Sequence, residues 1–524
     1  MAFPRDGWRS ARSRRYYPGG EPAPGQPRLP GRPATEPAAH PAAAHPAARA
    51  TPVPPSPAVP PRGRRFGAPA AQTAGTPEPP AQSLWRLIVS GVEWTPLFVG
   101  FLVYVLSVTT RVVAAGDVAM VFCLVALGLQ KDALRFPPFL VVFAVFVTWC
   151  WVGYASTDYP NTVWQAAYDT VKLWAITLVA ANALRTRAQL RFFMIFFLAC
   201  FAFYPTRGAY FNYYIYHHRP FGRAVWKYIY SNPNDLATLT ILQLSMAASL
   251  LMSEGKNLVR TAAFVGLGVL TLLVFMTQSR GAILALGVFG FAALFYSKHQ
   301  RLRTVFVVGG VLAVLVMFAP SSVWQRLRAM RSVASNVDLR TVDKSDRGSA
   351  EQRFEIWRVA RKIIADHPAF GVGIGAYPLA HYVYAQNPEF KGTAHGYRDT
   401  HSTFLNVAAE AGFPGLLLYL GIFGTVALHA EKTRRRARDA VPRTARQLLF
   451  LELGLLAFFI AGVFGSYSHL SFAYVHAVLV WAFAEMVDGE LVARAPRRGG
   501  TVPAPSRGTR GAPASKAPRR GARA

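Results

Sequence analysis

The distribution of apolar residues constrains this chain more than any other feature of its sequence. Of the 524 residues, 52% are hydrophobic and only 16% are charged, whereas charged residues make up about a quarter of a typical soluble protein. The apolar residues are gathered in blocks close to the length of about 20 residues that an α-helix needs to cross a bilayer. The sequence therefore predicts an all-α polytopic membrane protein.

Hydropathy predicts about twelve membrane spans. A long hydrophilic segment, residues 319–402, separates the ninth span from the tenth. We expect spans 1–9 within residues 85–318, a large helical loop at 319–402, and spans 10–12 within 403–490. The predicted spans are centred near Val103, Phe122, Ala144, Ile176, Phe197, Leu242, Val269, Gly287, Leu312, Leu418, Ala457 and Val478.

Residues 1–84 and 491–524 flank the apolar blocks and consist mainly of Pro, Ala, Arg and Gly. Segments with so few aliphatic clusters bury too little apolar surface to offset their ordering entropy, so we expect two disordered basic tails. They either hold to anionic lipid headgroups or act as plain solubilising tails. The first tail lacks the apolar stretch and cleavage site of a signal peptide.

The formal net charge of +31 reflects membrane topology, because the excess Arg lies in the tails and in short loops. Without a basic stripe on a folded domain, we expect no nucleic-acid partner. The short loops on the opposite side, at 109–111, 154–168, 277–280 and 465–471, hold only Arg111 and Arg280. The positive-inside rule then places both termini in the cytoplasm and the large loop outside the inner (plasma) membrane. Seventeen Lys and Arg lie in the alternate loops 130–135, 185–191, 253–260, 297–303 and 431–446.

Arginines on the outer side oppose the charge bias that orients the protein, so their presence there needs another explanation. Arg280 follows a Thr-Gln-Ser run at a span mouth, Arg223 follows an aromatic belt, and Arg353 lies in the large loop. A guanidinium presents a fork of donors that matches phosphoryl oxygens. The alternative is a side chain that only snorkels to the interface.

Residues 350–366 carry Phe354, Trp357, Ala360 and Ile364 at helical spacing, which predicts an amphipathic helix after an N-cap at Ser349. The run Gly371-x-Gly373-x-Gly375 follows no clear strand, so tight turns are favoured over nucleotide binding.

An imidazole stands where the large loop returns to an apolar block. His401-Ser402 is followed after nine residues by Gly412-Phe413-Pro414-Gly415. An uncharged His401 can take a proton near neutral pH, although a capping role is the alternative. Glu410 falls at the edge of a span, where a carboxylate is costly unless it is paired; it either orients a catalytic group or makes a structural pair. Asn234 either caps a helix or contacts substrate.

The pattern His-Ser-x9-Gly-x-x-Gly resembles the signature of the bacterial O-antigen ligase family, which are polytopic glycan transferases. The resemblance covers roughly residues 95–488 and includes Thr277-Gln278-Ser279-Arg280-Gly281-Ala282, Arg353-x-x-x-Trp357 and Ser231-Asn232-Pro233-Asn234-Asp235. It implies transfer of a glycan, with inversion, from a polyprenyl (undecaprenyl) diphosphate donor to a hydroxyl of a glycan, lipid or protein acceptor in surface polysaccharide or lipopolysaccharide biosynthesis.

The same resemblance implies residue roles. His401 and Arg280 are the expected catalytic residues, and Arg223, Arg280 and Arg353 are expected to bind the diphosphate. Glu410, Asn234 and Ser402 are expected to support them. No metal and no cofactor are implied, although a metal stays conceivable because Asp338, Asp343 and Asp346 lie in the loop.

Other functions share parts of this pattern. A polysaccharide polymerase or a protein O-oligosaccharyl ligase would use the same donor, and the sequence does not separate their acceptors. A transporter or flippase also needs many spans, but ionisable groups near the membrane midplane are typical of proton-coupled transport, whereas here they gather at span ends. A non-catalytic scaffold would tolerate loss of His401.

Overall fold

The computed structural model describes residues 88–111, 115–130, 132–252, 257–296, 305, 309 and 344–494, without the side chains of 257 and 344–350. The chain forms two units, Met1–Ser83 and Leu84–Ala524, and all described residues belong to the second. Both predicted tails lie almost wholly outside the described residues. So do the predicted ninth span near Leu312 and residues 319–343 of the large loop.

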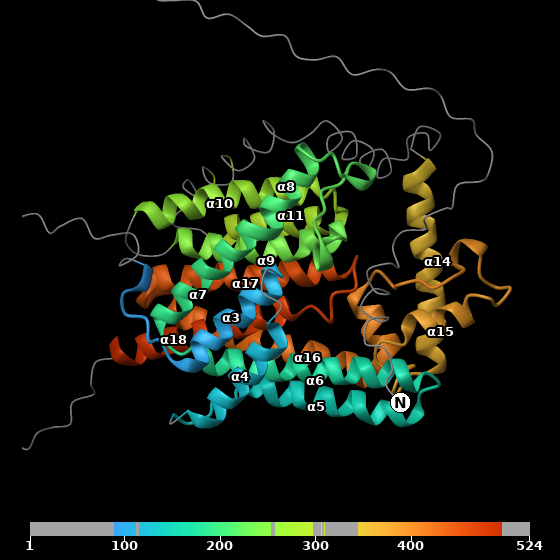
Figure 1. Cartoon of the computed structure of the whole chain (residues 1–524), viewed down its shortest axis with the longest axis horizontal. Helices are drawn as coiled ribbons and strands as arrows, with labels where there is room; N and C mark the ends of the chain where they lie inside the picture. The colour runs from blue at the N-terminus through green and yellow to red at the C-terminus, as the bar shows by residue number, and fades with distance from the viewer. Residues whose placement is uncertain are drawn as a thin grey trace, which may run out of the picture. The chain divides into compact units, whose positions relative to one another are not determined.

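The described secondary structure is entirely helical, which confirms the all-α class (Figure 1). Every predicted span centre except Leu312, which is not described, falls inside a described α-helix. The described α-helices are α3 (Pro96–Thr110), α4 (Gly116–Leu129), α5 (Pro138–Val152), α6 (Pro160–Ala183), α7 (Arg187–Phe201), α8 (Arg207–Tyr214), α9 (Pro233–Leu251), α10 (Asn257–Met276), α11 (Arg280–Tyr296), α14 (Lys344–Asp366), α15 (Tyr377–Tyr384), α16 (Thr403–Ala440), α17 (Pro442–Gly462) and α18 (Ser471–Arg494).

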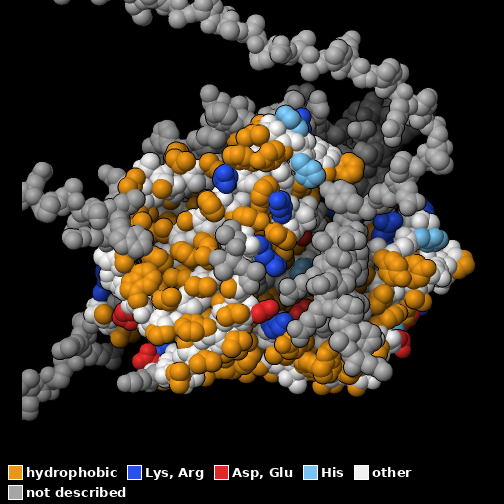
Figure 2. Space-filling view, viewed as in Figure 1, with side chains coloured by type: hydrophobic (Ala, Val, Ile, Leu, Met, Phe, Trp, Pro, Cys, Tyr) orange, Lys and Arg blue, Asp and Glu red, His pale blue; other side chains and the backbone are white. Residues whose placement is uncertain are grey.

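Several helices have the length and composition of membrane spans. In the described part of the chain five qualify, and α3, α4 and α11 are shorter apolar helices. Hydrophobic side chains cover much of the face shown in Figure 2, and Val118, Leu417 and Leu428 are 71–74% exposed. Large aliphatic side chains exposed in such numbers suit contact with lipid. The chain is therefore a multi-pass membrane protein, and the total of twelve spans stays a prediction.

Helix α9 is the central helix of the bundle. Every residue from Leu236 to Leu251 is buried, and α9 packs against α7, α10, α11, α17 and α18. A helix that is buried on all sides has no lipid-facing stripe. Its first turn, which carries Asn234, is half-buried at the end of this buried stretch.

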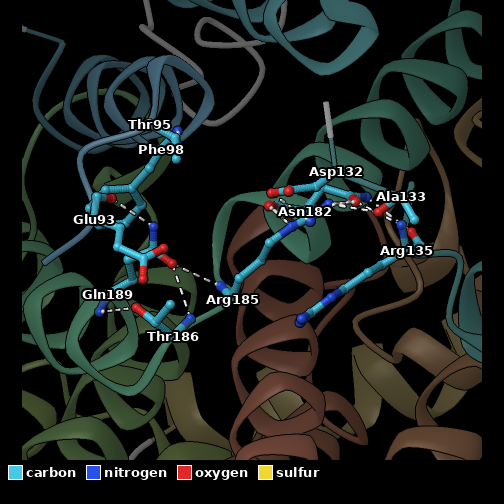
Figure 3. Close-up of polar contacts among 10 residues, drawn as sticks. All are labelled: Glu93, Thr95, Phe98, Asp132, Ala133, Arg135, Asn182, Arg185, Thr186 and Gln189. Carbon is cyan, nitrogen blue, oxygen red and sulfur yellow. Dashed lines mark hydrogen bonds and ion pairs between the residues drawn. The ribbon is translucent and has the colours of Figure 1, made fainter. Parts of the chain in front are cut away.

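One end of the bundle gathers loops that the charge pattern assigns to the cytoplasm (Figure 3). Arg185 Nη1 lies 3.2 Å from Asp132 Oδ2 and so joins the loop after α4 to the loop after α6. Gln189 Nε2 donates to the carbonyl of Glu93 at 2.8 Å, which ties the start of α7 to the segment before α3. The two basic loops and the beginning of the described bundle therefore share one end.

Helix α16 runs from the opposite end to this one. At its start Thr403 Oγ1 donates to the carbonyl of Gly465 at 2.7 Å, in the loop between α17 and α18. At its end Arg494 Nη1 donates to the carbonyl of Ala440 at 3.3 Å. The predicted outer and inner loops thus occupy opposite ends of the α16–α18 group, whereas the end that faces the cytoplasm stays a prediction from charge.

The predicted amphipathic helix exists as α14, with two corrections. It begins at Lys344 instead of after Ser349, and Phe354 is 58% exposed instead of buried. The buried stripe contains Ile356, Val359, Ala360, Ile363 and Ile364, because α14 packs on α15 and α16 at a rotation that the apolar spacing left open. Arg353 lies one turn before Ile356 and so shares the packed face.

Candidate active site

Helix α16 is broken within the motif that follows His401. Gly412 has φ 71°, a left-handed conformation that glycine adopts at little cost, and Pro414 has no N–H to continue the helical ladder. The break separates a short segment, 403–411, from the long remainder of α16. His401 and Ser402 stand directly before the short segment.

The loop between α14 and α15 satisfies the backbone groups freed by this break. It approaches so closely that a Cβ on Gly371 would lie 2.6 Å from the carbonyl oxygen of Ala409, and one on Gly412 would lie 2.0 Å from that of Ala369. The glycine-rich run therefore serves tight turns and close packing, as the sequence favoured. The hydrogen bonds are Val372 N to Ala409 O at 2.9 Å, Gly373 N to Glu410 O at 3.0 Å, Phe413 N to Pro368 O at 2.9 Å and Trp149 Nε1 to Ala411 O at 2.9 Å.

Glu410 uses its carboxylate to hold the start of α15. Oε1 accepts from the backbone N–H of Tyr377 at 3.4 Å, and the backbone of Gly375 and the side chain of Asn406 also donate to this group. The side chain is buried. The sequence left open whether Glu410 orients a catalytic group or makes a structural pair. These contacts favour the structural role, because the carboxylate lies at a helix N-terminus, where negative charge is favoured.

A hydrogen-bonded turn holds the backbone on which His401 stands. Thr400 Oγ1 donates to the carbonyl of Ser402 at 2.8 Å and lies 2.9 Å from Ser466 Oγ. Ser466 Oγ donates to Asp399 Oδ1 at 2.7 Å, and Trp357 Nε1 donates to the carbonyl of Thr400 at 2.8 Å. Helix α14, the loop and the α17–α18 connection thus all fix this turn, in which His401 has φ 51°.

His401 lies among charges of both signs. Burial lowers the pKa of its imidazole below the usual range, Asp399 acts to raise that pKa, and Arg353 and Arg398 act to lower it. A lowered pKa keeps the ring uncharged at neutral pH. The uncharged form is the one that can accept a proton from a hydroxyl.

Arg223 is fixed where the start of α9 meets the turn before α11. Its Nε donates to the carbonyl of Thr277 at 2.7 Å, and its Nη2 donates to Asn234 Oδ1 at 2.7 Å. Asn232 accepts from the backbone N–H of Asn234 at 2.9 Å and caps α9. Asn232 therefore fulfils the capping role, whereas the side chain of Asn234 orients the guanidinium of Arg223.

Arg280 is exposed at the first position of α11. A Cβ on the next residue, Gly281, would lie 2.8 Å from Phe464 Cβ, so the start of α11 packs on the α17–α18 loop. Gln278 Nε2 donates to the carbonyl of Gly222 at 3.0 Å. The segments that carry Arg223 and Arg280 are consequently bound to each other.

Further charged and polar residues join this site that the sequence did not single out. Burial raises the pKa of the Tyr467 hydroxyl, Asp235 and Asp399 raise it further, and Arg353 opposes them, so these groups lie within electrostatic reach of one another. Asp235 directly follows Asn234 and Asp399 precedes His401 by two residues, which is a signal that could have found them. For Tyr467 the sequence offers no such signal.

The predicted residues thus converge from distant segments, with one exception. His401, Arg353, Arg223 with Asn234, and Arg280 lie around the α17–α18 loop and the start of α9. Glu410 instead contacts the start of α15, although it lies within electrostatic reach of Asp399. Within the described residues no group of three or more His, Cys, Asp or Glu is placed to hold a metal ion. Asp338 and Asp343 lie outside these residues, and the side chain of Asp346 is not described.

Fold and site together define a multi-pass α-helical membrane protein with a half-buried, partly cationic site at one end of its bundle. Residues 265–420 match the family model of O-antigen ligase, and no curated protein matches the chain. Over this segment the chain is similar to the O-antigen ligase family. The segment includes Arg280, Arg353, His401 and Glu410, whereas Arg223 and Asn234 precede it.

Proposed function

We propose that this protein transfers a glycan from a polyprenyl diphosphate carrier to an acceptor hydroxyl at the outer face of a bacterial inner membrane. The observation that carries the proposal is the position of His401, which lies with a lowered pKa among Arg353, Arg398 and Asp399 inside the segment that matches the O-antigen ligase family.

In the proposed reaction the acceptor oxygen attacks the anomeric carbon of the donor glycan. A new carbon–oxygen bond forms on the face opposite the carrier, and the bond between the anomeric carbon and the diphosphate oxygen breaks with its electron pair. His401 takes the acceptor proton, and polyprenyl diphosphate leaves. The product has the inverted anomeric configuration.

The leaving diphosphate gains negative charge as the bond breaks, so positive groups at this point stabilise the transition state. Arg280 and Arg353 supply such groups within the family segment, and Arg223 supplies a third. Asn234 and the carbonyl of Thr277 hold Arg223 in one orientation. We assign the charge compensation to these arginines, so the proposed reaction needs no metal ion.

The proposed side of the membrane follows from the asymmetry of Lys and Arg between the loops. Gly392 is exposed in the large loop, and a Cβ there meets nothing within 4 Å; Asp439 is 96% exposed at the other end. In a background that lacks the three native cysteines, an impermeant thiol reagent should label Gly392→Cys on intact spheroplasts and Asp439→Cys only after lysis. The reverse pattern would place the site in the cytoplasm.

The direct test is transfer by purified protein in lipid, with a polyprenyl diphosphate-linked glycan and acceptors of the glycan, lipid and protein classes. We expect one class to receive the glycan with inverted anomeric configuration. A retained configuration would contradict direct attack, and the absence of transfer to all three classes would contradict the proposed activity.

A further inference from the structure

A cavity of about 390 Å³ lies between α11, α16, α17 and α18. It opens beside Leu420 and Leu456, which are 37% and 47% exposed on two helices that qualify as membrane spans. Arg434, at its charged end, is 22 residues beyond the break at Gly412, or about 33 Å along a helix. The charged end is therefore distant from the proposed active site, whereas the apolar end reaches Phe459, whose ring centre lies 6.1 Å from that of Phe404.

Most of the lining is apolar, and the charged groups lie together at one end. Arg434 Nε donates to Glu452 Oε2 at 2.6 Å, and its Nη2 donates to Glu431. Its guanidinium lies 5.1 Å from the ring centre of Tyr296. Arg435 also donates to Glu431. Two arginines thus balance two carboxylates, so this end attracts neither anions nor cations strongly.

One oxygen in this lining still needs a donor. Glu452 Oε1 is buried and has no hydrogen-bond partner within the described part of the chain, although its other oxygen is paired with Arg434. A buried acceptor without a partner is costly. A ligand that completes the cavity should therefore present an N–H donor beside Glu452 and an apolar chain along Phe423, Leu453 and Phe459.

We propose that this cavity binds a membrane phospholipid with a primary ammonium headgroup, such as phosphatidylethanolamine. Its ammonium group donates to Glu452 Oε1, its phosphate lies toward Arg435, and one acyl chain fills the apolar part between α16 and α17. Phosphatidylcholine lacks the N–H donors, and phosphatidylglycerol adds a negative charge beside two carboxylates. Both should bind less well.

Native mass spectrometry of the full chain with each of the three lipids tests this site. Glu452→Gln should weaken phosphatidylethanolamine binding by about tenfold or more, because a hydrogen bond to a charged group contributes about 1.5–3 kcal/mol. Glu485→Gln, a carboxylate on α18 outside the lining, should leave it unchanged.

A second pair of variants guards against misfolding of Glu452→Gln. Gly424 lines the cavity, and a Cβ there meets nothing within 4 Å, so Gly424→Leu should fit the fold, fill the cavity and remove binding. Gly290→Leu, on α11 and equally open, is the matched control. Equal binding of all three lipids, loss of binding in neither cavity variant, or selective binding of polyprenyl phosphate instead would overturn the proposal.

Discussion

Gly412→Ala should damage the site from within the helix break. The alanine would occupy a backbone conformation, φ 71° and ψ −177°, that is essentially confined to glycine and costs other residues about 1–3 kcal/mol. Its Cβ would lie 2.0 Å from the carbonyl oxygen of Ala369, so the loop must move away. That movement would strain three hydrogen bonds between the loop and α16 (Val372 N to Ala409 O, Gly373 N to Glu410 O and Phe413 N to Pro368 O), each worth about 1 kcal/mol.

These contributions add to about 4–6 kcal/mol, a large fraction of the stability of an ordinary domain. The assay compares the midpoint of thermal unfolding and the transfer rate with those of Gly424→Ala on the same helix. That control has open space around the new methyl group, and alanine should raise helix stability there by about 1 kcal/mol. We expect a lower midpoint and lost transfer for Gly412→Ala alone. A Gly412→Ala protein with wild-type midpoint and rate would refute the structural role of the break.

Three further predictions concern the proposed chemistry. Transfer should fall as pH decreases through the pKa of His401; Asp399→Asn removes a charge that raises this pKa and should move the acid limb to lower pH, whereas Arg398→Gln should move it to higher pH. Identical pH profiles in these variants would contradict a base at this position. Arg280→Lys should lower the rate and donor affinity by about tenfold or more, because lysine cannot reproduce a bidentate pair with phosphoryl oxygens; wild-type values would leave only a snorkelling role. Transfer should persist in excess EDTA, and a complete loss restored by magnesium or manganese would contradict charge compensation by arginine alone.

The sequence predicted the helices better than their contacts. Hydropathy located every described span centre, because a run of apolar residues in lipid has few alternatives to a helix. Hydropathy did not reveal which face of α14 is buried, because Phe354 and Ile356 are both apolar. Only the packing of α14 on α15 and α16 buries Ile356 and leaves Phe354 exposed. The sequence also did not predict that a loop would replace the hydrogen bonds lost at Gly412.

The sequence likewise predicted the individual residues of the candidate site better than the contacts between them. Motif spacing singled out His401 and Arg353, and charge asymmetry singled out Arg280, because each of these signals is local in the chain. Asp399 meets Ser466 across 67 residues, and Tyr467 joins the site only through the α17–α18 loop. Such partners are set by tertiary packing, which one sequence without its relatives does not reveal.

The central claim is that His401 removes the acceptor proton, and the transfer rate of His401→Ala tests it most directly. His395 is the matched control, because it lies exposed in the same loop and contributes its backbone carbonyl, not its ring, to the contact with Arg398. At saturating donor and acceptor, we expect His401→Ala to lose about a hundred- to ten-thousand-fold in rate, with unchanged membrane insertion and unfolding midpoint, and His395→Ala to keep the wild-type rate. Near-normal turnover by His401→Ala would contradict the account.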